Sequence, residues 1–188
     1  SLGGSGDDVA YSIQQSADGG YIMAGYSQSN NGDVIGNHGS WDYWVVKLSS
    51  IGAVEWQKSL GGGGDDVAYS IQQSTDGGYI VAGYSDSKNS DVTGNHGLKD
   101  YWVVKLSPVG AIEWQKSLGG RGDDVANSIQ QSIDGGYIVA GFSFSKDGDV
   151  SGNHGGNDSW VVKLSPAGAL EWQKSLGGIG GDRAQSIQ

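Results

Sequence analysis

One segment of this 188-residue chain places oxygen-bearing side chains at a spacing that suits calcium. They occupy the first, third, fifth and twelfth positions: Asp147, Asp149, Ser151 and Asp158. Gly152 follows at the sixth position, where calcium loops make their sharp turn. The spacing therefore predicts a calcium site, although strands rather than helices are expected to flank it.

Two earlier segments repeat this pattern less completely, with Asn at the first position and Ile35 or Thr93 at the fifth. Their candidate ligands are Asn31, Asp33, Asp42, Asn89, Asp91 and Asp100. Asp and Asn also form side-chain-to-backbone hydrogen bonds in loops that hold no metal. The sequence is therefore compatible with two roles for these side chains, calcium binding and hydrogen bonding within the loop.

Three histidines, His38, His96 and His154, each lie in a GNHG motif. Imidazole can ligate a transition metal, bind a ligand or act as a base. The chain has no Cys, and no second His lies nearby in sequence. The pattern therefore favours a packed or hydrogen-bonded imidazole over a metal cluster.

Six tryptophans recur at fixed positions in apolar runs, where aromatic area is expected to fill a core. They are Trp44, Trp56, Trp102, Trp114, Trp160 and Trp172. The seventh, Trp41, lies in a variable loop where the later copies carry Lys99 and Asn157. Trp41 is the candidate for stacking against a sugar.

A catalytic centre needs acids, bases or nucleophiles with distinct roles, and every charged motif here is instead repeated. Glu55, Glu113 and Glu171 lie close in sequence to lysines and are expected to be solvated charges. We therefore expect a chain that is not an enzyme.

All these residues belong to a repeat of 58 residues. Residues 1–58, 59–116 and 117–174 align without gaps, and residues 175–188 begin a fourth copy. The copies are nearly identical, so recurrence alone does not separate functional positions from copied ones.

Each copy predicts four antiparallel strands. In the second copy these are Val67–Ser74, Tyr79–Ser85, Tyr101–Ser107 and a strand around Ile112 and Trp114. An Asp-Gly-Gly turn joins the first strand to the second, and a Pro-x-Gly turn joins the third to the fourth. The expected fold is an all-β propeller of four-stranded blades, with three blades and the first strand of a fourth; a β-solenoid is the alternative.

Propellers close with four or more blades, so three need further repeats of the same chain or homo-oligomerisation. We expect a piece of a longer protein. Because strands alternate in direction, each GNHG loop and each Asp-rich GDD segment between copies should emerge at the same edge. That shared edge is the predicted functional face.

The formal charge of −10 and pI of about 4.4 oppose binding to nucleic acid, which needs clustered Lys and Arg. No apolar run approaches the roughly 20 residues of a membrane-spanning helix. Partners are therefore expected among proteins or glycans, with no membrane insertion.

Three motifs, LGG-x-GDD, DGG-YIVAGYS and WVVKLSP-x-GA, recur in this order. In this order they resemble the bacterial β-propeller repeat family of SBBP type, over essentially the whole chain. The resemblance implies a secreted or cell-surface protein without shared catalytic residues. The long loop with GNHG departs from that family.

From these features we expect a structural or interaction module stabilised by calcium. A carbohydrate-binding propeller is the alternative, and a glycan-acting hydrolase comes third.

Overall fold

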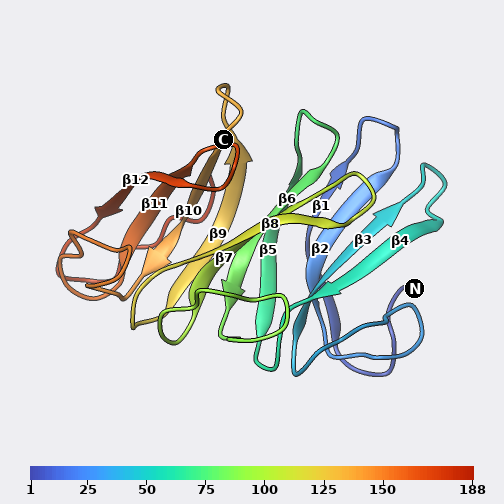
Figure 1. Cartoon of the computed structure of the whole chain (residues 1–188), viewed down its shortest axis with the longest axis horizontal. Coiled ribbons are helices and arrows are strands. Elements are labelled where there is room, and N and C mark those ends of the chain that lie inside the picture. The colour runs from blue at the N-terminus through green and yellow to red at the C-terminus, as the bar shows by residue number, and fades with distance from the viewer.

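The computed structural model describes all 188 residues and contains twelve β-strands and no helix (Figure 1). The first sheet comprises β1 (Asp8–Gln15), β2 (Tyr21–Ser27), β3 (Asp42–Leu48) and β4 (Val54–Leu60). The second comprises β5 (Asp66–Gln73), β6 (Tyr79–Ser85), β7 (Asp100–Leu106) and β8 (Ile112–Leu118). The third comprises β9 (Asp124–Gln131), β10 (Tyr137–Ser143), β11 (Asp158–Leu164) and β12 (Leu170–Leu176).

Within each sheet the strands pair antiparallel in chain order, which confirms the all-β prediction. The sheets stand side by side as separate four-stranded units and do not close into a ring (Figure 1). The final strand of each sheet ends two residues into the next copy, at Leu60, Leu118 and Leu176.

The middle strands form where Val, Ile, Tyr and Trp are concentrated, and β6 and β7 are buried along their whole length. A tight turn joins β5 to β6. There the backbone N–H of Gly78 donates to Asp76 Oδ1 at 2.9 Å, and Gly77 takes a φ of 83°. The predicted Asp-Gly-Gly turn is therefore confirmed.

Neighbouring sheets pack face to face through their first strands. β5 contacts β1, β2 and β3, and β9 contacts β5, β6 and β7. Trp102 and Trp160 are fully buried in the two resulting cores. Their carbonyl oxygens each accept a 2.9 Å hydrogen bond across the junction, from the hydroxyls of Tyr43 and Tyr101 respectively.

Residues 175–188, the start of the fourth copy, contact the third sheet in the same way as β9 contacts the second sheet. The N–H of Asp182 donates to the carbonyl of Asn157 at 2.7 Å, as that of Asp124 does to Lys99 at 2.6 Å. The N–H of Ile187 also donates to Ser128 Oγ at 3.3 Å. The same junction is thus begun a third time.

A buried lysine lies at the turn end of each sheet, which the sequence interpretation missed. Lys105 is only 2% exposed and contacts Asp76 at 2.8 Å and Glu113 at 3.0 Å. Lys47 and Lys163 make the equivalent pairs. The strand glutamates are 44% exposed, in agreement with the prediction of solvated charges, but each one also pairs with a buried ammonium group.

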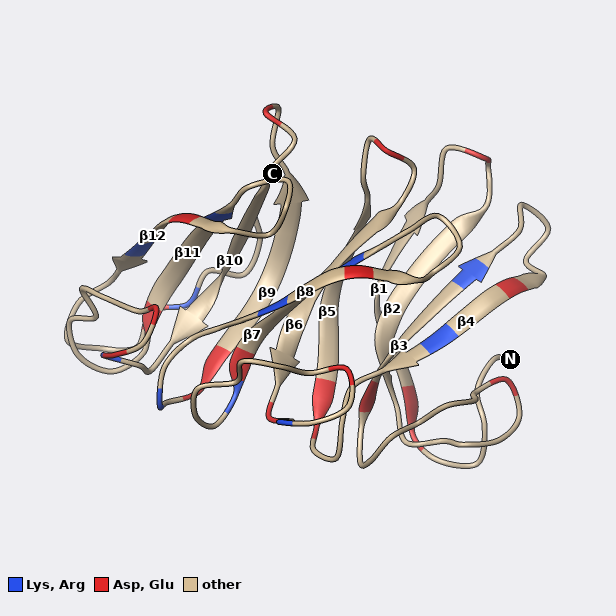
Figure 2. Ribbon diagram, in the orientation of Figure 1, with Lys and Arg blue, Asp and Glu red and all other residues tan.

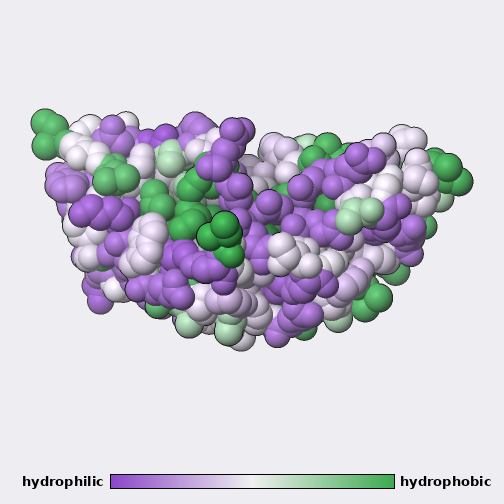
Figure 3. Space-filling model, turned by 90° about the horizontal axis from the view of Figure 1, so that it is seen from above, coloured by the Kyte–Doolittle hydropathy of each residue, from purple (hydrophilic) through white to green (hydrophobic).

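The structure contains no helix with the length and apolar character needed to cross a membrane. Seen from above, the surface is mostly hydrophilic, with hydrophobic residues in separate groups (Figure 3). Ile133, at the turn between β9 and β10, is fully exposed.

Candidate functional site

The acidic edge of the molecule is formed by two kinds of segment. The long loops join the second and third strands of each sheet (residues 28–41, 86–99 and 144–157), and the linking segments join successive sheets (residues 61–65 and 119–123). The N–H of Asp91 donates to the carbonyl of Gly61 at 3.1 Å, and Gly61 N–H donates to Asp91 Oδ2 at 3.2 Å. Asp residues are concentrated along this end of the strands (Figure 2). The structure thus brings the two predicted segments together.

The predicted calcium ligands point toward different partners. In the second copy, Asn89 Oδ1 accepts a 2.8 Å bond from Gly63 N–H, and Asp91 accepts from Gly61 N–H, whereas Asp100 turns to His96. The first and third copies repeat this division, through Asn31, Asp33, Asp42, Asp147, Asp149 and Asp158. Ser151 at the fifth position contacts Gln173.

No group of three or more His, Asp or Glu side chains is arranged to hold a metal ion. The hydrogen bonds from the linking segments match the alternative in which Asp and Asn order the loop. Calcium binding by these loops stays a prediction, since the predicted ligands of one loop face different partners and would have to converge on the ion.

Each histidine forms a pair with a buried aspartate four residues later. The distance from His Nδ1 to Asp Oδ2 is 2.7 Å in all three copies, joining His38 to Asp42, His96 to Asp100 and His154 to Asp158. The same carboxylate oxygen accepts the backbone N–H of its histidine. The prediction of a hydrogen-bonded imidazole is therefore confirmed.

A second buried carboxylate lies at each junction. Asp66 opens β5 with no exposed surface, and its Oδ2 accepts from Gly62 N–H at 2.8 Å and Ser87 Oγ at 2.9 Å. Burial, together with the nearby Asp42 carboxylate, raises its pKa to about 6 despite these bonds and a bond from Ser85. Asp124 has a pKa of about 6 for the same reason, beside Asp100.

The paired carboxylates leave no room for a side chain between them. A Cβ built on Gly61 would collide with Asp66 Oδ2 and lie 3.0 Å from Asp42 Oδ1. That Asp42 oxygen is buried and has no hydrogen-bond partner. Burial accordingly raises the pKa of Asp42, against the hydrogen bonds from His38.

An aromatic row crosses the first strands of the sheets, and the sequence interpretation missed it. Trp41 stacks on Tyr26 at 4.8 Å, and Tyr11 contacts Tyr26 at 6.1 Å and Tyr69 at 5.0 Å. Tyr69 continues the row to Tyr84 at 6.1 Å. Tyr11 and Tyr69 stand at β-bulges, which redirect their side chains out of the strand alternation.

A cavity of about 520 Å³ lies at the far end of this row. Tyr69, Tyr84 and Phe142 line it together with two cations. Lys99 Nζ lies 4.2 Å from the ring centroid of Tyr84, and Arg183 lies 4.3 Å from that of Phe142. The only sequence signal for this grouping was an aromatic residue at the twenty-sixth position of all three copies and at the eleventh position of the first two.

No known family model matches the chain, and no curated protein matches it. Among solved structures, a protein of unknown function from Bacteroides caccae is similar, with a TM-score of 0.49 and 12% identity. The match covers 92% of this chain and 48% of that one, so the chain spans about half the length of that structure.

Proposed function

We propose that this chain is a structural or interaction module, built from propeller blades, of a larger secreted or cell-surface repeat protein related to the SBBP type. The observation that carries the proposal is the repeated junction. Successive sheets bury the same residues and make the same hydrogen bonds, and the fourth copy begins that junction again. A unit that rebuilds its own docking surface is suited to assembling a rigid ring.

Adding copies tests the propeller part of this proposal. Extending the chain with further copies of residues 59–116 should produce a closed, disc-shaped particle in small-angle scattering. Closure should also protect the β1 amides from hydrogen exchange, because the last sheet would then cover β1. An array that keeps lengthening without closing would contradict the propeller and favour a solenoid.

A carbohydrate-binding role is the second candidate, because the aromatic row offers exposed ring faces. Tyr11 is 51% exposed, and aromatic faces suit the apolar faces of sugars. A glycan array should detect binding that Tyr11→Ala and Trp41→Ala abolish. Trp172→Ala is the matched control, since Trp172 is 48% exposed but lies outside the row. Equal loss in all three variants would contradict this role.

Calcium stabilisation is tested by melting the chain with calcium and with a chelator. A ligand that binds only the folded chain raises its melting temperature. Asp33→Asn, Asp91→Asn and Asp149→Asn together should remove the calcium effect. No difference between calcium and chelator in the unaltered chain would end the calcium proposal.

The hydrolase, the third candidate, requires turnover of a glycan. Incubating the full-length protein with oligosaccharides and measuring released reducing ends decides it. The module proposal expects no release.

A further inference from the structure

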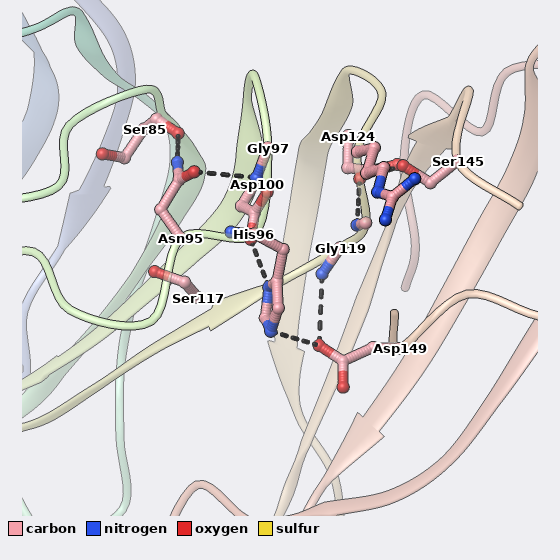
Figure 4. A network of polar contacts seen from close by, with 12 residues as sticks. Ser85, Asn95, His96, Gly97, Asp100, Ser117, Gly119, Asp124, Ser145 and Asp149 are labelled. Carbon is pink, nitrogen blue, oxygen red and sulfur yellow. Dashed lines mark hydrogen bonds and ion pairs between the residues drawn. The ribbon is translucent and has the colours of Figure 1, made fainter. Parts of the chain in front are cut away.

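The junction between the second and third sheets brings a histidine and a carboxylate from different copies face to face (Figure 4). His96, in the long loop after β6, places its Nε2 atom 3.9 Å from Asp149 Oδ2, in the long loop after β10. This separation exceeds the 2.7–3.2 Å range of a hydrogen bond. The two groups therefore lie at ion-pair distance but are not hydrogen-bonded.

The histidine ring is held so that Nε2 is available. Asp100 is fully buried, and its carboxylate accepts from Nδ1 of His96 at 2.7 Å. With Nδ1 engaged by Asp100, the ring presents its Nε2 atom toward Asp149. The side chains of His96 and Asp149 are 38% and 25% exposed, so the gap between them is open to solvent.

The backbone of the linking segment also fixes the position of the Asp149 carboxylate. Asp149 Oδ2 accepts from Gly119 N–H at 3.3 Å, and Asp149 N–H donates to the carbonyl of Gly119 at 2.9 Å. The linking segment thereby fixes Asp149 opposite the histidine. Its other carboxylate oxygen remains available to a ligand.

We propose that His96 and Asp149 bind a divalent transition-metal ion of the zinc class across this junction. Zinc takes imidazole nitrogen and carboxylate oxygen at about 2.0–2.2 Å. In a tetrahedral arrangement two such ligands stand roughly 3.3–3.5 Å apart. The observed 3.9 Å therefore needs only a small side-chain rotation to admit the ion.

The surroundings fit such a site in one further respect. Metal-binding histidines usually donate their other ring N–H to a carboxylate, as His96 does to Asp100. Two side chains are the whole protein contribution, since no third one joins them. Water fills the remaining positions, which makes the site open and its ion exchangeable.

The other junctions provide an internal comparison. His38 and Asp91 line one cavity of about 510 Å³ at the first junction, where they can form an equivalent pair. His154 is held by Asp158 in the same way, but no carboxylate forms an ion pair with its Nε2 atom. His154 is therefore the control for an exposed histidine without the cross-junction partner.

Calorimetric titration of the whole chain with zinc chloride tests the proposal. Asp149→Asn and His96→Gln should each lower the stoichiometry by one equivalent, whereas His154→Gln should leave it unchanged. The affinity of the altered site for zinc should fall by roughly 10- to 100-fold or more, because changing even a residue that only hydrogen-bonds a metal ligand typically has an effect of that size. The titration is carried out without calcium, because Asp149 is also a predicted calcium ligand.

Asp149→Asn keeps an oxygen acceptor for Gly119 N–H, and a thermal melt of each variant checks that it folds. A folded Asp149→Asn chain with undiminished zinc uptake would overturn the proposal. So would an equal loss in His154→Gln, or no zinc binding by the unaltered chain at millimolar concentration.

Discussion

Buried carboxyl groups set the pH response at the scale of single residues. Asp66 and Asp124 have folded-state pKa values of about 6, above the value of about 4 expected in the unfolded chain. A raised pKa means that ionisation of the carboxyl group opposes folding. The stability of the folded chain that depends on the protonated groups is therefore fully present below about pH 4 and is lost as the pH rises through 6. The loss is at most about 3 kcal/mol for each group.

We predict that Asp66→Asn flattens the fall in the free energy of unfolding between pH 4 and 7. Asn retains an oxygen for Gly62 N–H and Ser87, but it carries no charge to bury. Urea denaturation across this pH range measures the effect. The first-copy equivalent is the control: Asp8 lies near the surface, and hydrogen bonds from Ser27, Gly4 and Ser29 keep its pKa below the usual value despite some burial.

Asp8→Asn should therefore leave the fall between pH 4 and 7 in place. Stability that depends on Asp8 should instead disappear as the pH drops below 4. Asp18 acts in the same lower window, because hydrogen bonds from Lys47 and Gly20 lower its pKa to about 2. Identical pH profiles for Asp66→Asn and the unaltered chain would contradict the assignment.

At the scale of the strand pair, a bulge governs which residues are tolerated. Gly83 in β6 faces the bulge of β5, where a Cβ would collide with the Val67 carbonyl and lie 2.8 Å from the Tyr43 hydroxyl of the preceding sheet. We predict that Gly83→Ala destabilises the chain by about 3 kcal/mol or more, because backbone must move. Chemical denaturation gives the value.

Gly94 is the matched control for this substitution. It has a φ of 80° but no atom within 4 Å of a built Cβ. Gly94→Ala should therefore carry only the penalty of a left-handed backbone, about 1 kcal/mol. A loss at Gly83 no larger than that at Gly94 would show that the contact at the bulge relaxes and does not set the requirement.

At the scale of the whole molecule, packing between sheets determines how much identical residues of different copies contribute to the free energy of unfolding. Ile71 in β5 is 5% exposed, because the first sheet covers it. Ile13, at the same repeat position, is 64% exposed. We predict that Ile71→Ala lowers the unfolding free energy by about 2–5 kcal/mol, and Ile13→Ala by less than about 1 kcal/mol.

Denaturation of both variants in one buffer measures this difference. The flanking sequence is the same at both positions, so local strand propensity cancels. Similar losses would mean that a partner covers the first sheet in solution, and sedimentation would reveal that partner as a larger mass.

Three of the four strands of the second copy could be predicted from the sequence to within a residue at either end. Tyr79–Ser85 was predicted as it stands in β6, because an apolar run between a glycine turn and a long polar loop has few alternatives. The meeting of long loops and linking segments followed from strand alternation alone. The hydrogen-bonded histidine also followed, because its neighbours offered no second metal ligand.

Other features were absent from the local pattern because their partners lie far along the chain. Lys105 meets Asp76 across a sheet, and His96 meets Asp149, 53 positions later in the sequence. The bulge at Tyr69 depends on strand register rather than on residue type. The repeat, its strands and its acidic edge follow from the sequence, since they depend on local periodicity. Which copies of the same residue are buried or paired depends on the neighbouring sheet, so these differences appear only in the folded chain.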